Sequence, residues 1–309
     1  MKKICVAGLN PSWQKTLIFE HFERGGINRA SSMEMMPSGK GINFARAVKN
    51  WGLAECTVFQ FLAGDAGKRV RKGLWQEKIA NISVETPGET RTCTTALSAS
   101  DQVMTELIEP APAVPPMEAA ALFESCCGAI PSADALAVCG TYPPGINEFF
   151  YARTAAKARE HGKFILVDAF KNTGPLLEDG ADLLKINLDE LRELTGKEDP
   201  AEAFRTCFER YAIRFLAVTD GPAGAWFAGR SDGQLYRISV PDVKVVNPIG
   251  SGDTCSGVTL SCILDGLDPL EAFRQGLAAA TANCMTLLPA CFEKDQALAL
   301  LDEFTVSAV

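Results

Sequence analysis

A glycine-rich segment near residue 250 carries the strongest chemical signal in the sequence. It reads Asn-Pro-Ile-Gly-Ser-Gly-Asp-Thr at 247–254, between a strand-like run at 243–246 and a stretch typical of a helix. Glycines at such a turn free backbone N–H groups to bind an anion at the positive end of the helix. Asp253, in the first helical turn, would then take a proton from a hydroxyl that attacks a phosphoryl group. The backbone amides of three neighbouring residues would stabilise the negative charge on the transferred phosphoryl group: Gly250, Ser251 and Gly252.

A second polar turn lies at Gly39, Lys40 and Gly41, just before another helical stretch. It presents one ammonium group and several amides to a polar ligand, and Asn43 in the first turn has an amide that suits sugar hydroxyls. Taken alone, each of the two segments is also explained by an ordinary turn before a helix.

Two common nucleotide motifs are excluded. Residue 255 is Cys where the Gly-x-Gly-x-x-Gly fingerprint needs Gly, and residue 41 is Gly where a P-loop needs Ser or Thr. Any nucleotide must therefore be held in another way.

The composition narrows the chemistry further. The chain has 309 residues, with 30 Lys and Arg against 38 Asp and Glu, a net charge of -8 and only two His. The excess of acid argues against a nucleic-acid partner, which needs a basic surface. Because His is scarce, we expect a carboxylate or a lysine to act as the base. The odd number of cysteines, 11, the lack of a signal peptide and the lack of a membrane-spanning run predict a cytoplasmic protein with no membrane partner.

The elements that must position these residues alternate along the chain. Short apolar runs typical of buried parallel strands occur at 4–7, 57–62, 135–138, 164–167 and 215–218. Helical stretches lie between them, which predicts an α/β fold with a doubly wound, mostly parallel central sheet flanked by helices. Two regions of mixed polarity, 12–36 and 91–108, instead predict a small antiparallel β lid assembled from distant parts of the chain.

In this order, the segments resemble the PfkB family of ribokinase-like carbohydrate kinases, over nearly all of residues 1–309. The turn Gly-Thr-Tyr-Pro-Pro-Gly at 140–145 and the run Lys-Ile-Asn-Leu-Asp-Glu-Leu at 185–191 are similar to elements of that family. Asn-Pro-Ile-Gly-Ser-Gly-Asp, Leu-Asn-Pro at 9–11 and Thr-Glu-Leu at 105–107 resemble the branch of tagatose-6-phosphate kinase and 1-phosphofructokinase. The resemblance implies a single kinase domain with an inserted lid.

The resemblance also implies roles for individual residues. Asp253 would be the catalytic base beside the anion-binding amides, and Asn187 and Glu190 would orient the Mg2+ of MgATP. Residues expected to contact ATP are Lys185, Asn187, Thr219, Gly221, Gly224 and Asn283. Residues expected to contact the acceptor are Gln14, Gly39, Lys40, Asn43 and Arg91. Arg91 would pair with a phosphate already present on the acceptor, and a homodimer through the lid sheet is a further expectation.

Several positions depart from the family pattern around the acceptor. Gln14 stands where the family typically has Asp, Ser38 replaces a usual Gly, and the loop at 168–174 is longer than the family's Asp-x-x-Gly. We therefore expect an ATP-dependent kinase that phosphorylates a primary hydroxyl of a ketohexose monophosphate, of the tagatose 6-phosphate, fructose 1-phosphate or fructose 6-phosphate type. The alternatives are a kinase of an unphosphorylated sugar or nucleoside, and a catalytically silent sugar-binding regulatory protein.

Overall fold

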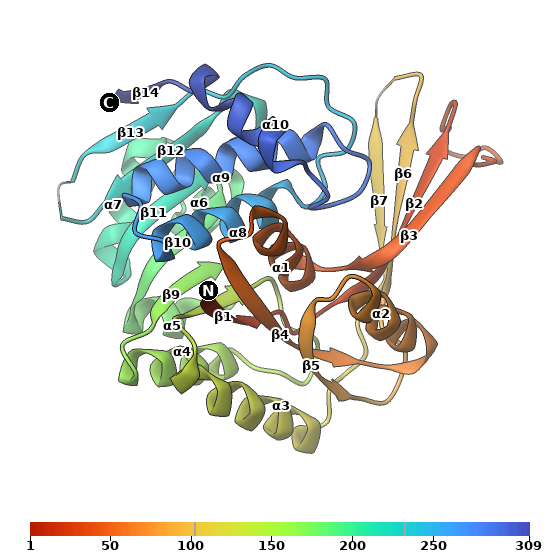
Figure 1. Ribbon diagram of the computed structural model, residues 1–309, viewed down its shortest axis with the longest axis horizontal. Helices are drawn as coiled ribbons and strands as arrows, with labels where there is room; N and C mark the ends of the chain where they lie inside the picture. The colour runs from red at the N-terminus through yellow and green to blue at the C-terminus, as the bar shows by residue number, and fades with distance from the viewer. Residues whose placement is uncertain (102, 232) are drawn as a thin grey trace.

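The structure is a computed structural model that describes residues 1–101, 103–231 and 233–309 (Figure 1). Among these residues the main sheet has ten strands, in the order β14-β13-β12-β11-β10-β9-β8-β1-β4-β5. Their bounds are β1 (Lys2–Ala7), β4 (Ala54–Leu62), β5 (Ala80–Glu85), β8 (Ala135–Cys139), β9 (Phe164–Asp168), β10 (Ala181–Asn187), β11 (Ile213–Thr219), β12 (Ala225–Gly229), β13 (Leu235–Ile238) and β14 (Val306–Ala308). The strands from β5 to β11 run parallel, while β12, β13 and β14 are antiparallel additions at one edge.

Helices cover both faces of this sheet, as expected for a doubly wound fold. One face carries α1 (Lys40–Trp51), α2 (Gly64–Gln76), α8 (Ser251–Leu264) and α9 (Pro269–Cys284), with α10 (Lys294–Ala299) outside them. The other carries α3 (Pro116–Ala129), α4 (Phe149–Glu160), α5 (Gly174–Asp179), α6 (Leu188–Thr195) and α7 (Pro200–Arg210). Each face has its own buried apolar cluster, which is why the strands consist of nearly continuous apolar residues.

A smaller sheet projects from the main body, as Figure 1 shows. It consists of β2 (Ser12–Phe19), β3 (Ser32–Ser38), β6 (Thr92–Ser98) and β7 (Met104–Ile108), in the order β3-β2-β6-β7. The expected lid at 12–36 and 91–108 is therefore present, with residue 102 outside the described part of the chain. Only its two outer pairs are antiparallel. The central pair of β2 and β6 is parallel, because both strands leave the main body in the same direction before each turns back through a hairpin.

The segment at 243–246 is not the strand that its apolar residues suggested. Val245 and Val246 are 46% and 42% exposed. The backbone N–H of Val246 donates instead to the carbonyl of Cys284, at the end of α9. Since the segment pairs with no strand, its valines reach the surface, close to the start of the glycine-rich turn.

Helices α1 and α8 pack closely, and this contact sets the position of the residues on both. A Cβ atom on Gly257 would lie 2.8 Å from the carbonyl oxygen of Phe44 and 3.2 Å from the Val48 side chain. Only a glycine at 257 therefore allows the two helices to approach this closely without a backbone shift.

We expect Gly257→Ala to lower the free energy of unfolding by about 1–3 kcal/mol, because the added methyl group meets backbone of α1. Gly128→Ala is the matched control: Gly128 lies in α3 with open space around it, so alanine should stabilise the helix by about 0.5–1 kcal/mol. Chemical denaturation of both variants measures the difference. Equal effects of the two substitutions would contradict a tight α1–α8 contact.

Candidate active site

The predicted site residues gather where the parallel strands end and two helices begin. Asp168 is the last residue of β9, while Lys40 starts α1 and Ser251 starts α8. A Cβ atom on Gly41 would lie 2.6 Å from the Cα atom of Gly8, just after β1. The start of α1 therefore touches the end of β1 directly. Ligands of open α/β sheets bind at this edge, outside the carboxyl ends of the strands.

Asp253 is buried in the first turn of α8, and the Nδ2 of Asn43 donates a hydrogen bond of 2.8 Å to its Oδ2. Burial raises the pKa of Asp253 to about 6, and the nearby Asp168 carboxylate also raises it, against the effects of Lys40, Asn43 and Lys185. A carboxyl group with this pKa can accept a proton near neutral pH, as a general base must.

Asp168 lies beside two lysines that are close to Asp253. Its carboxylate accepts hydrogen bonds from Lys40 Nζ at 2.8 Å and from Ser256 Oγ at 2.5 Å, and Lys185 Nζ lies 3.9 Å away. Burial alone would raise the pKa of Asp168, but Lys185 and Lys40 keep it below its ordinary value. Burial alone would likewise lower the pKa of Lys40, but Asp168 and Asp253 raise it. At neutral pH Lys40 and Asp168 therefore form an ion pair, and Asp253, with a pKa of about 6, is mostly ionised.

The start of α8 is the candidate cradle for an anion, where the Ser251 N–H donates to the Pro248 carbonyl at 3.2 Å. Gly250 has a φ of 78°, which favours glycine, and it turns the chain into the helix. A Cβ atom on Gly252 would lie 2.9 Å from Lys185 Nζ, so the Lys185 ammonium group faces the helical amides. An anion bound here would meet both the amides and a positive charge.

Asn283 has a different environment from the one expected. Its side chain is fully buried; Nδ2 donates to the carbonyl of Ile249, and Oδ1 accepts from the backbone of Ala290. These bonds connect the loop before Gly250 to the loop after α9. The structure therefore gives this side chain a role in shaping the cradle, because no surface of it is left for a direct contact with adenine.

Asn187 and Glu190 form the start of α6. Asn187 is the N-cap, and the two side chains each accept a hydrogen bond from the other residue's backbone N–H. Asn187 pairs with Thr219 across β10 and β11, and Gly221 and Gly224 follow in the next turn. Most of the residues expected to contact ATP thus lie at the ends of two neighbouring strands, β10 and β11, and in the turn after β11.

A pocket of about 160 Å³ lies on the other side of Lys40. Its lining combines lid, strand ends and the long loop: Gly8, Asn10, Lys40, Gly41, Arg91, Cys139, Gly140, Thr141, Ala169, Phe170, Lys171 and Glu190. Arg91 donates to the carbonyls of Asn10 and Pro11, which hold its guanidinium at the base of the lid. Lys40, Arg91 and Glu190 therefore share one pocket.

Two expected acceptor residues point elsewhere. Gln14 is buried in the lid sheet, where its Nε2 donates to Thr95 Oγ1 at 2.7 Å. Asn43 is 3% exposed and faces Asp253. Gly39, with a φ of 109°, precedes α1, where a Cβ atom would lie 2.9 Å from the Cα of Pro11.

Asp168 and Ser256 were not among the expected site residues. Asp168 had two signals in the sequence: it ends an apolar strand run, and it begins the loop that is similar to the family's Asp-x-x-Gly.

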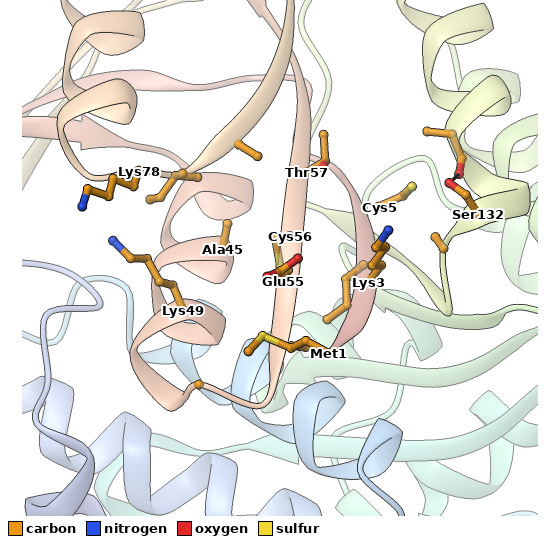
Figure 2. Close-up of a pocket in the computed structure, with 17 residues that line it drawn as sticks. Met1, Lys3, Cys5, Ala45, Lys49, Glu55, Cys56, Thr57, Lys78 and Ser132 are labelled. Carbon is orange, nitrogen blue, oxygen red and sulfur yellow. Dashed lines mark hydrogen bonds between the residues drawn. The ribbon is translucent and has the colours of Figure 1, made fainter.

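A larger groove of about 630 Å³ lies at the opposite edge of the sheet, where β1 and β4 begin (Figure 2). Lys3, Lys49 and Lys78 line it, but Lys49 Nζ donates to the carbonyl of Glu77 at the end of α2. A lysine beside a helix C-terminus complements the negative end of the helix dipole. This groove contains none of the predicted site residues.

Comparison with known proteins agrees with the geometry. Residues 1–288 match the family described as pfkB family carbohydrate kinase. The chain belongs to this family. It is 27% identical over 291 residues to a tagatose-6-phosphate kinase of Staphylococcus epidermidis, with 90% of each chain covered. Phosphofructokinase-2 from Escherichia coli, solved in complex with fructose-6-phosphate, has a TM-score of 0.85 at 23% identity over 98% of this chain and 99% of that one. The tetrameric inhibited form of the same enzyme gives 0.85 at 22%, with the same coverage.

The kinase is thus a phosphotransferase with an alcohol group as acceptor, and its fold is that of ribokinase-like enzymes. No helix in the described residues is long and apolar enough to cross a membrane. The homodimer through the lid stays a prediction. Apolar side chains exposed on the lid strands fit it: Met33, Met35, Leu107 and Ile108.

We expect Asp253→Asn to stabilise this kinase at pH 8 by on the order of 2 kcal/mol. The folded protein binds the Asp253 proton more tightly than the unfolded chain does, so the ionised carboxylate destabilises the fold above pH 6. The gain should therefore shrink as the pH falls from 6 toward 4, where the carboxyl group is neutral. Unfolding of both proteins across this pH range measures it, and a gain that does not change with pH would contradict the raised pKa.

Proposed function

We propose that the kinase transfers the γ-phosphoryl group of ATP to a primary hydroxyl of a ketohexose monophosphate, with Asp253 as the base. The observation that carries this proposal is the buried Asp253 carboxylate at the start of α8, with Lys40 beside it and the Lys185 ammonium group facing the same helical turn. A proton acceptor and an anion cradle thus share one helix end, which suits in-line phosphoryl transfer.

The residues present fit MgATP. The cradle at Gly250, Ser251 and Gly252 would receive the terminal phosphates together with Lys185. Thr219, Gly221 and Gly224 would lie along the nucleotide, and Asn187 and Glu190 would hold Mg2+, whose preferred ligands are oxygens and water. When bound, Mg2+ neutralises charge on the phosphoryl oxygens. Among the described residues no cluster of three or more His, Cys, Asp or Glu could hold a metal.

The reaction assigned to the chain's own residues is simple. Asp253 accepts the proton of the acceptor hydroxyl as the hydroxyl oxygen attacks the γ-phosphorus of ATP. The bond from that phosphorus to the bridging oxygen of the β-phosphate breaks and ADP leaves, while the amides of α8 and Lys185 stabilise the charge on the phosphoryl oxygens. Lys40 stays with Asp168, so it contributes positive charge without neutralising the base. With a pKa of about 6, Asp253 returns its proton to water after each turnover.

A phosphorylated acceptor is supported by the pocket beside Lys40. Arg91 and Lys171 both line it, and a planar guanidinium suits two phosphate oxygens at once. A relative 27% identical to this chain is a tagatose-6-phosphate kinase, and the phosphofructokinase-2 of similar fold was solved with fructose-6-phosphate. An unphosphorylated acceptor is the alternative if Arg91 does not bind phosphate.

We expect ADP release with at least one of fructose 1-phosphate, fructose 6-phosphate and tagatose 6-phosphate, measured against free sugars and a nucleoside. Asp253→Asn keeps the shape but removes the base, so it should lower kcat by about 10²–10⁴-fold. A silent regulatory protein would release no ADP above that variant with any acceptor, and this outcome would remove the proposed function for these substrates.

We expect Arg91→Ala to raise KM for a phosphorylated acceptor by about tenfold or more, with little change in KM for ATP. Arg29, exposed in the loop between β2 and β3, supplies the matched control Arg29→Ala, which should change neither value. If the phosphorylated acceptor keeps its KM in Arg91→Ala, the phosphate-binding role of Arg91 is wrong, and the unphosphorylated acceptor becomes the better reading.

A further inference from the structure

Arg46, in the second turn of α1, is a charged side chain that the proposed reaction does not use. It is 5% exposed, yet every N–H group of its guanidinium has an acceptor. Nε donates to Glu77 Oε2 at 2.6 Å, and Nη2 donates to Glu77 Oε1 at 3.1 Å and to the Pro37 carbonyl at 2.7 Å. Nη1 donates to Asn43 Oδ1 at 3.1 Å and to the Pro289 carbonyl at 3.2 Å. Five donors meet five acceptors, so the group is held in one orientation.

These acceptors lie on the separate parts from which the site is built. Pro37 lies near the end of lid strand β3, and a Cβ atom on Gly73 of α2 would overlap its ring. Pro289 packs against Gly250, since a Cβ atom there would lie 2.8 Å from the Pro289 side chain. Arg46 thus connects the end of lid strand β3 to the loop that packs against Gly250.

The contact with Asn43 has a consequence for the base. An amide can present either its oxygen or its nitrogen to a neighbour, but a guanidinium only donates. Arg46 therefore requires the Asn43 oxygen to face it, and the Ser38 hydroxyl donates to the same oxygen at 3.1 Å. The Asn43 nitrogen must then face Asp253, where it donates to Oδ2 at 2.8 Å.

We propose that Arg46 is a positioning residue for phosphoryl transfer, which fixes the Asn43 amide so that Asn43 orients the Asp253 carboxylate toward the acceptor hydroxyl. This inference rests on the proposed function, because it assumes that Asp253 is the base. Arg46 itself touches none of the reacting groups.

The other charged or titratable groups facing Asp253 come from different elements. They are Lys40 at the start of α1, Asp168 at the end of β9, Lys185 in β10 and Cys139 at the end of β8. None of them bonds to Arg46, so a change at 46 alters the site through Asn43 and leaves these groups in place.

The test is Arg46→Lys, which keeps the positive charge but offers three donors in place of five. We expect kcat to fall at least about tenfold, with KM for both substrates nearly unchanged. If the Asn43 amide turns, its oxygen faces the carboxylate. In a plot of kcat against pH, the midpoint of the acid limb, where kcat is half its maximum, should then rise from near pH 6 by about one pH unit.

Arg230→Lys is the matched control, because Arg230 donates to the carbonyls of Phe208, Tyr211 and Ile213 at the far edge of the sheet. It should lower stability without moving the acid limb. A folded Arg46→Lys protein with an unmoved acid limb overturns the proposal. If Arg46→Lys does not fold, Glu77→Gln weakens the hold on the same guanidinium at a partner that is 27% exposed, and the same two outcomes decide. Asp253→Asn separates the two ideas: full activity there removes the proposed function itself, whereas an inactive Asp253→Asn with an unmoved limb in Arg46→Lys removes only the role of Arg46.

Discussion

The pairing of Lys40 with Asp168 is the interaction on which the rest of the site depends. An ammonium group bonded directly to Asp253 would lower the pKa of that carboxyl group by about 1–3 units and make it a weak base. Because Asp168 takes the Lys40 hydrogen bond at 2.8 Å, burial dominates at Asp253 and its pKa rises to about 6. Lys40 still contributes its charge to the pocket. The two buried carboxylates thus have different environments: Asp168 is a counter-ion, and Asp253 has the raised pKa that the proposed proton acceptor needs.

This division works only if two helices begin at the same point. Gly41 against Gly8 and Gly257 against Phe44 are backbone contacts that a side chain would prevent, and they bring the start of α1 beside the start of α8. Both helices then present positive dipole ends to one small volume. In a chain with a net charge of -8, this local arrangement lets a protein that repels polyanions overall bind a small anion at one place.

The parts that were predictable from the sequence are those encoded locally. Short, nearly continuous apolar runs indicated the parallel strands, and the turns before α1 and α8 indicated where the candidate site lies. The pairings between distant segments were not predictable: Lys40 with Asp168, Arg46 with Pro289, and the parallel contact between β2 and β6. Short edge strands such as β14 depend on a neighbour more than on their own composition, and the valines at 243–246 lacked such a neighbour. The contact of Asn283 with the nucleotide was an expectation from the family resemblance, whereas its buried hydrogen bonds connect two loops.

The positions that depart from the family pattern differ in whether they contact Asn43, the residue that bonds to Asp253. Gln14 bonds within the lid sheet, and the long loop at 168–174 brings Phe170 and Lys171 to the acceptor pocket; neither bonds to Asp253. Ser38 differs, because its hydroxyl donates to the Asn43 oxygen that Arg46 also holds. The lid strand that carries Ser38 is therefore connected to Asp253 through the Asn43 side chain. A change at Gln14 or in the loop leaves this connection in place, whereas a change at the end of β3 reaches Asp253 through it.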